Sequence, residues 1–152
     1  MRVKLICVGK LKEKYLKEAC NEYSKRISGF GKIEIVEVPD EKDDRPDAKS
    51  IEGKKILKNI RSNEYVVTME IKGEAQSSEQ LAEKMSTLAV KGISDITFVI
   101  GGSNGLHEEV SKRADYKLSF SKMTFPHQLA RVMLLEQIYR AYKINQGSKY
   151  HK

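Results

Sequence analysis

The sequence predicts an α/β fold with a mainly parallel sheet and helices on both faces. Along the 152 residues, segments rich in β-branched residues alternate with segments of helical periodicity. Hydrophobic residues make up 39% and charged residues 32%, with only 3 prolines, which is typical of a globular protein rather than a disordered chain. Because a parallel pair of strands needs a long crossover, such alternation is typical of parallel sheets. At this length we expect one domain spanning residues 1–152.

The expected strands are short runs of apolar and β-branched residues between polar segments. They are residues 3–8, 33–38, 65–71, 95–100 and 116–120. The expected helices occupy the stretches between these runs and after the last one. They are residues 12–28, 48–61, 77–90, 107–113 and 127–146.

Individual helices carry further signals. In the first, Tyr15, Ala19 and Tyr23 recur every four residues, which predicts an amphipathic helix on the sheet. The third is expected to be capped by Ser77 or Ser78. The charged segment 39–47 between the second strand and the second helix is expected to be a solvated loop within the domain.

The last helix carries two apolar arcs, whereas one domain core can cover only one. The second apolar arc favours packing against a second copy of the chain, although deep burial within one chain would produce the same pattern. The two arcs are Leu129, Val132, Met133, Leu135, Ile138, Tyr139 and Tyr142, and Ala130, Leu134 and Ala141.

Composition narrows the class of partner. The longest apolar runs, such as residues 96–100, are far below the roughly 20 residues that cross a bilayer, and no signal peptide precedes the first strand. We therefore expect a cytoplasmic protein with no membrane partner. Cys7 and Cys20 lack zinc-site or disulfide spacing, so we expect two buried thiols and no metal. The net charge of +7 favours a polyanionic partner without proving one.

The segment most indicative of a ligand begins where a buried strand is expected to end. There Gly101, Gly102 and Gly105 form a turn that opens the helix expected at 107–113. Glycines let a ligand touch bare backbone at the carboxyl end of a strand, where open α/β sheets bind ligands. The spacing matches neither GxGxxG nor a P-loop. Glu108 and Glu109 in the first helical turn would repel a phosphate, so we expect a ligand that presents none to this turn.

A second irregular stretch, residues 118–128, follows the last expected strand and mixes hydroxyls, bulky apolar groups and Pro126. Apolar walls with a few hydroxyl and backbone groups suit a ring such as adenine. A nucleoside with a sulfonium and an amino-acid tail, as in S-adenosylmethionine, fits both segments. A plain structural connection is the alternative for this stretch, as a plain turn is for the glycine segment.

Several segments together closely resemble the SPOUT class of RNA methyltransferases. The resemblance covers essentially the whole chain and is far more specific than any single motif. The segments that carry it are residues 98–105, 118–127, 136–142 and 150–152, together with 8–12 and 30–40.

This resemblance implies a SPOUT fold with a C-terminal deep trefoil knot and a homodimer with active sites at the subunit interface. It implies S-adenosylmethionine as cofactor and 23S rRNA within the ribosome as substrate, methylated at N3 of a pseudouridine in helix 69. No metal is implied. Carried onto matching positions, the cofactor-binding residues are Met69, Gly101, Phe120, Ser121, Lys122, Met123, Thr124 and Phe125.

Because N3 carries a proton at neutral pH, some group must accept it during such a transfer. The candidates are His127, Tyr150 and His151, although His127 directly after Pro126 is equally placed to begin a helix. Two alternatives from other classes remain open at this point. One is a nucleotide-binding enzyme on a doubly wound sheet, and the other is a non-catalytic basic protein that binds the ribosome.

Overall fold

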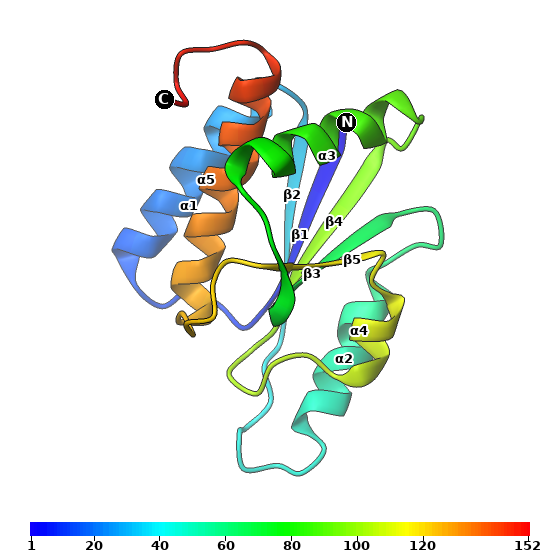
Figure 1. The fold of residues 1–152 in the computed structure, drawn as a ribbon. Helices are drawn as coiled ribbons and strands as arrows, with labels where there is room; N and C mark the ends of the chain where they lie inside the picture. The colour runs from blue at the N-terminus through cyan, green and yellow to red at the C-terminus, as the bar shows by residue number, and fades with distance from the viewer.

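Five parallel strands form one sheet in the order β2-β1-β4-β3-β5 in the computed structural model, which describes residues 1–152. Helices connect successive strands, which confirms the predicted α/β class (Figure 1). The strands are β1 (Arg2–Val8), β2 (Lys32–Val38), β3 (Tyr65–Ala75), β4 (Asp95–Ile100) and β5 (Tyr116–Ser119). The helices are α1 (Lys14–Ser28), α2 (Ala48–Lys58), α3 (Ser78–Val90), α4 (Glu108–Arg113) and α5 (His127–Asn145).

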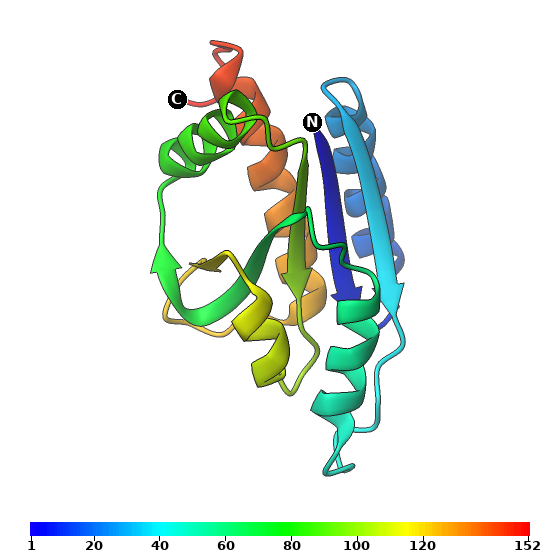
Figure 2. The same cartoon turned by 90° about the vertical axis from the view of Figure 1, so that its right-hand side faces the viewer.

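The sheet is buried on both faces. In β1, Val3, Leu5 and Cys7 belong to a core shared with α1, α3 and α5, whereas Ile6 and Val8 belong to a second core shared with α2 and α4. Helices α1 and α5 lie side by side on the first face, and α2 lies beside α4 on the other (Figures 1 and 2). β1 and β4 are buried at every position after their first residue, and apart from Lys4 and Thr97 these buried residues are apolar, as in strands covered on both faces.

The predicted elements are all present, with shifts at their ends. Helix α1 begins at Lys14 rather than at residue 12, and α4 begins at Glu108 after its N-cap His107. Helix α2 ends at Lys58 rather than at 61, because the chain turns there and the Arg61 backbone N–H donates to the Glu64 carboxylate. Of the two serines considered as caps for α3, Ser77 forms the capping box with Gln80.

Strand β3 is longer than predicted, running to Ala75 rather than 71. Its register against β5 shifts between Met69 and Glu74, so the strand bends away from β4 and crosses β5 again (Figure 2). The crossing is close, since a Cβ on Gly73 would lie 2.8 Å from the Lys117 backbone. β5 ends at Ser119, which leaves Phe120 in the following loop.

Cys7 and Cys20 are buried free thiols, as predicted. Burial raises the pKa of Cys7 to about 12, so the thiol stays protonated and unreactive at neutral pH. None of the helices has the length and apolar character that crossing a membrane would require. The trefoil knot stays a prediction.

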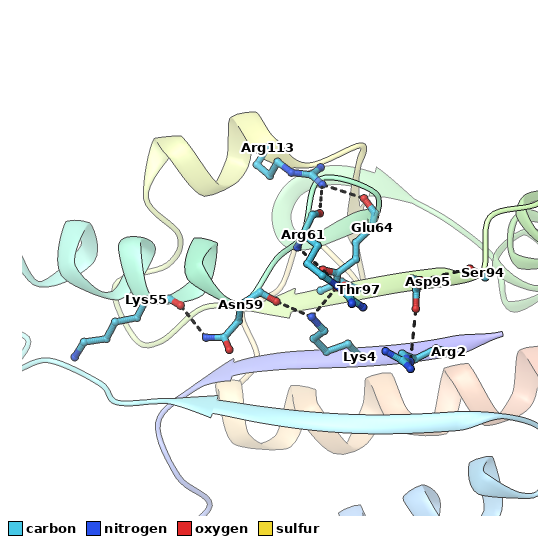
Figure 3. Close-up of polar contacts among 10 residues, drawn as sticks. All are labelled: Arg2, Lys4, Lys55, Asn59, Arg61, Glu64, Ser94, Asp95, Thr97 and Arg113. Atoms are coloured by element: carbon cyan, nitrogen blue, oxygen red, sulfur yellow. Dashed lines mark hydrogen bonds and ion pairs between the residues drawn. The ribbon is translucent and has the colours of Figure 1, made fainter.

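A polar cluster lies on the face of the sheet covered by α2 and α4, over the amino-terminal halves of β1 and β4 (Figure 3). The buried Glu64 carboxylate pairs with Lys4 Nζ at 2.7 Å and accepts from Thr97 Oγ1 at 2.6 Å. Lys4 Nζ also donates to the Asn59 carbonyl at 2.6 Å, and Arg113 Nη2 donates to the Glu64 carbonyl at 3.0 Å. The cluster therefore joins β1, β4, the end of α2 and the end of α4.

The pKa of Glu64 lies below its usual value. Burial alone would raise the pKa, but hydrogen bonds from Lys4, Thr97 and the Arg61 N–H more than offset this effect. A carboxyl whose pKa is lower in the folded state stabilises the fold above its unfolded pKa of about 4.3, and this stabilisation is lost as pH falls through the folded pKa.

We predict that Glu64→Gln lowers the free energy of unfolding by about 3 kcal/mol at pH 7, because it leaves the Lys4 ammonium buried without a counter-charge. Denaturant unfolding of both proteins measures the difference. The matched control is Glu18→Gln, which breaks the exposed pair with Lys14 and should cost less than about 0.5 kcal/mol. Equal losses in the two variants, or a wild-type pH dependence below pH 5 in Glu64→Gln, would contradict this prediction.

Candidate cofactor site at the carboxyl ends of three strands

A cavity of about 740 Å³ opens where β3, β4 and β5 end or bend. Parallel pairing brings these ends to one edge of the sheet, which is where open α/β sheets bind ligands. The lining residues come from the bend of β3, the glycine turn after β4 and the loop from β5 into α5. They are Met69, Glu70, Ile71, Ile100, Gly101, Gly102, Ser103, Asn104, Gly105, Leu106, Leu118, Ser119, Phe120, Ser121, Met123, Thr124, Phe125, Pro126, His127 and Ala130.

The glycine turn folds tightly on itself. Gly105 has a φ of +78°, in the left-handed region, and its N–H donates to the Gly102 carbonyl at 3.0 Å. A Cβ on Gly101 would lie 2.9 Å from the backbone of Gly105 and equally near the Leu106 side chain. The turn therefore presents bare backbone to the cavity and has no room for a side chain at Gly101.

The charged loop 39–47 supports this turn from outside the cavity. Asp43 accepts from Ser103 Oγ at 2.6 Å, and the buried Glu52 of α2 accepts from the Glu41 N–H at 2.8 Å. A Cβ on Gly53 would lie 2.9 Å from the Cβ of His107, so α2 packs directly under the start of α4. The loop is exposed, as predicted, and it also braces the glycine turn.

The opposite wall is the loop 120–126, which is ordered by serine hydroxyls. Ser119 Oγ lies 3.0 Å from the carbonyl oxygens of Ile71 and Ser121, and it accepts from the Ser121 N–H at 3.2 Å. Ser121 Oγ in turn accepts from the Met123 N–H at 3.0 Å. These bonds hold Phe120 and Phe125 against the cavity and join the loop to the bend of β3.

Helix α5 carries the end of this wall and is fixed by Arg131. This buried guanidinium donates to Glu37 of β2 at 2.6 Å and to the Gly9 carbonyl after β1 at 3.1 Å. Its neighbour Ala130 lines the cavity. Arg131 therefore sets the position of the first turns of α5 relative to the ends of β1 and β2.

The structure brings together most of the residues that the family resemblance implied for cofactor binding. Met69, Gly101, Phe120, Ser121, Met123, Thr124 and Phe125 all line the cavity. Lys122 lies outside the lining and is exposed.

The three proton-acceptor candidates do not lie together. His127 lines the cavity as the first residue of α5, with Pro126 as N-cap. Tyr150 and His151 instead fold back on α5 further along: Tyr150 donates to Glu136 Oε2 at 2.7 Å, and His151 lies 2.6 Å from Glu79 and 3.0 Å from Arg140. The hydrogen bond to Glu136 raises the pKa of Tyr150 to about 12.

A second cavity of about 430 Å³ lies between the first cavity and this tail. It shares Phe120 and Phe125 with the first cavity, and Glu136, the partner of Tyr150, lines it. The two cavities therefore adjoin, and the tail docks on Glu136, a lining residue of the second cavity. The chain contains no group of three or more His, Cys, Asp or Glu side chains arranged to hold a metal ion.

One charged lining residue was not anticipated from the sequence. Glu70 follows Met69 in β3 and lines the cavity. The rule that ligands bind at the carboxyl ends of parallel strands could have indicated it. Glu70 was missed because the strand was expected to run straight to residue 71, whereas it bends after Met69.

Comparison with known proteins agrees with this architecture. A sequence model of the family described as "Predicted SPOUT methyltransferase" matches residues 1–151. Proteins named ribosomal RNA large subunit methyltransferase H from Clostridium novyi and Lactobacillus helveticus are 58% and 55% identical to this chain, each aligned over 100% of both chains.

Two solved structures share the fold at low sequence identity. A probable methylase family protein from Haemophilus influenzae has a TM-score of 0.59 and 17% identity, covering 99% of this chain and 70% of its own. The SpoU methyltransferase AviRb from Streptomyces viridochromogenes, solved in complex with the cofactor AdoMet, has a TM-score of 0.51 and 10% identity, covering 93% and 58%. With a family match over nearly its whole length, this chain belongs to the SPOUT methyltransferase family.

Proposed function

We propose that this protein transfers a methyl group from S-adenosylmethionine to N3 of a pseudouridine in helix 69 of 23S rRNA within the assembled ribosome. The observation that carries the proposal is the cavity at the strand ends, closed by a glycine turn and an apolar loop, in a chain whose full-length relatives bear the name of a large-subunit rRNA methyltransferase. Work on ribosomes would place the protein in the cytoplasm, and its net charge of +7 suits an RNA substrate.

The cavity fits this cofactor by size and chemistry. Its volume lies within the roughly 300–1,000 Å³ of small-molecule sites. Phe120, Met123 and Phe125 offer apolar walls for a purine ring, and the glycine turn offers backbone groups. Helix α4 presents Glu108 and Glu109 in its first turn, which disfavours the phosphates of an ordinary nucleotide.

When bound, S-adenosylmethionine supplies a methyl group on a positively charged sulfonium. The chain itself has to align the acceptor nitrogen with that carbon and exclude water, since alignment contributes most to a displacement of this kind. We propose that His127 accepts the N3 proton on a ring nitrogen, because it is the only one of the three candidates that lines the cavity.

We propose that Tyr150 and His151 contact the RNA substrate. Arg140 lies over the Tyr150 ring at 4.8 Å, and the tail adds Lys149 and Lys152, so aromatic and cationic groups gather beside the second cavity. Such a set suits stacking on an unpaired base while holding its phosphates.

We propose that two copies pair through α5. Ala130, Leu134 and Ala141 of one apolar arc are buried in the core, but in the other arc Leu129 remains 41% exposed and Met133 is half-buried beside it. An uncovered apolar face next to the cavity suits an interface that completes the site.

The first test is calorimetric titration with S-adenosylmethionine of the wild type and of Gly101→Val. We expect the variant to lose binding, because a side chain at Gly101 would meet the Gly105 backbone. Gly29→Ala, at a helical position with a φ of −70° far from the cavity, is the control and should bind as the wild type does. A folded Gly101→Val protein with unchanged affinity would remove the turn from the site.

The same titration separates the alternative functions. Binding of a nucleoside phosphate in place of S-adenosylmethionine would support a nucleotide-binding enzyme. Binding of neither ligand, with retained affinity for ribosomes, would support a non-catalytic ribosome-binding protein.

The second test is sedimentation at micromolar concentration, where we expect twice the 17.3 kDa mass of the chain. Leu129→Glu should produce monomers, because it places a charge on the proposed interface. Val90→Glu, at an exposed apolar residue on α3, is the control and should stay dimeric. A wild-type monomer that methylates ribosomes would count against the interface.

The third test removes residues 150–152. We expect S-adenosylmethionine affinity close to that of the wild type, and methyl transfer to ribosomes reduced about ten- to a hundredfold, since a stacking contact contributes roughly 1–3 kcal/mol. Tyr150→Phe, which keeps the ring and loses the bond to Glu136, should retain most of the activity. Full turnover by the truncated protein would show that the tail has no part in RNA binding.

A further inference from the structure

Glu70 is the only carboxylate in the lining of the main cavity, which contains no Lys or Arg and only one other charge-bearing candidate, His127. The remaining lining groups are apolar side chains, hydroxyls, one amide and backbone. Any net charge on a bound molecule would therefore interact chiefly with Glu70.

The Glu70 carboxylate is held in place by hydroxyl donors alone. Thr68 Oγ1, on the same strand and fully buried, donates to Oε2 at 2.6 Å. Ser111 Oγ of α4 lies 3.0 Å from both carboxylate oxygens. No cation of the protein pairs with the group, so its negative charge stays available to the cavity.

This arrangement is unusual for a purely structural carboxylate, because a half-buried charge without a cationic partner disfavours the folded state. Glu64 and Glu136 have such a partner in Lys4 and Arg140, whereas the buried Glu52 accepts from the backbone N–H of Glu41 and, like Glu70, pairs with no cation. A cationic ligand would supply the missing charge at Glu70.

We propose that Glu70 determines specificity for the positively charged cofactor over its neutral product. This inference rests on the proposed function. The amino and carboxylate groups of the amino-acid tail cancel in both molecules, so S-adenosylmethionine carries a net charge of +1 from its sulfonium, whereas S-adenosylhomocysteine carries none.

The methyl transfer itself removes the attraction. The bond from sulfur to the methyl carbon breaks and its electron pair stays on sulfur, while a new bond forms between the methyl carbon and N3, and the N3 proton leaves to a base. The product in the cavity is then a neutral thioether. Glu70 therefore favours loading of the cofactor and release of the product without any change in the shape of the site.

The test is to titrate S-adenosylmethionine and S-adenosylhomocysteine separately into wild type and Glu70→Gln, which keeps the size of the side chain and removes the charge. We expect the Kd for S-adenosylmethionine to rise about tenfold, as for an opposite charge in a partly hydrated cavity, and the Kd for S-adenosylhomocysteine to change less than about threefold. Glu70→Asp should recover part of the preference for S-adenosylmethionine. Thr68→Val should retain the charge and most of the preference.

Glu74→Gln is the matched control, because Glu74 lies on the same strand, bonds to Tyr116 and is outside the cavity lining. It should leave both affinities unchanged. Equal weakening of the two ligands by Glu70→Gln, in a protein of wild-type unfolding free energy, would overturn the inference, since the carboxylate would then act on the shared tail or on the fold. Failure of the wild type to bind either ligand would instead overturn the proposed function.

Discussion

Parallel pairing of the strands is the constraint on which the rest of this structure depends. It forces every strand to begin at one edge of the sheet and to end at the other, so the segments after β4 and β5 and the bend of β3 meet although they are far apart in sequence. The two edges are built differently. A buried ion pair between Lys4 and Glu64 lies toward the start of β1, and at the other end Arg131 pairs with Glu37 beside the glycines, serines and apolar loops of the cavity.

The polar cluster and the cavity therefore lie at different levels of the same sheet. The polar cluster around Glu64 needs complete hydrogen bonding, because a buried carboxylate without partners would be costly. The cavity end tolerates Glu70 with hydroxyl partners only, and Glu52 with one buried oxygen lacking any partner beside Gly102. Incomplete pairing is not confined to this end, because Ser24 Oγ, Arg131 Nε and the Tyr142 hydroxyl are also buried without a partner.

The sequence was sufficient to predict the elements whose signals are local. β-branched runs located all five strands, the serines at 77 and 78 located the start of α3, and the glycines at 101, 102 and 105 located a turn that lines the cavity. The sequence was not sufficient where the position of a residue depends on contacts with residues far away in the chain. The extension of β3 depends on the fit of Gly73 against Lys117, which no periodicity records. The exposed position of Lys122 among cavity-lining neighbours, and the docking of Tyr150 on Glu136, likewise depend on tertiary contacts.

Arg131 links completion of the cofactor pocket to the last part of the chain to be synthesised. Its guanidinium joins α5 to Gly9, 122 residues earlier, and to Glu37, 94 residues earlier. Contacts of such long sequence separation form late, because the intervening chain must first be closed into a loop. Loop 120–126 leads directly into α5, so a nascent chain that has not yet released α5 lacks the anchor of one wall of the pocket. Cofactor affinity in this protein is therefore a property of the finished chain, and it would report completion of folding more faithfully than secondary structure content does.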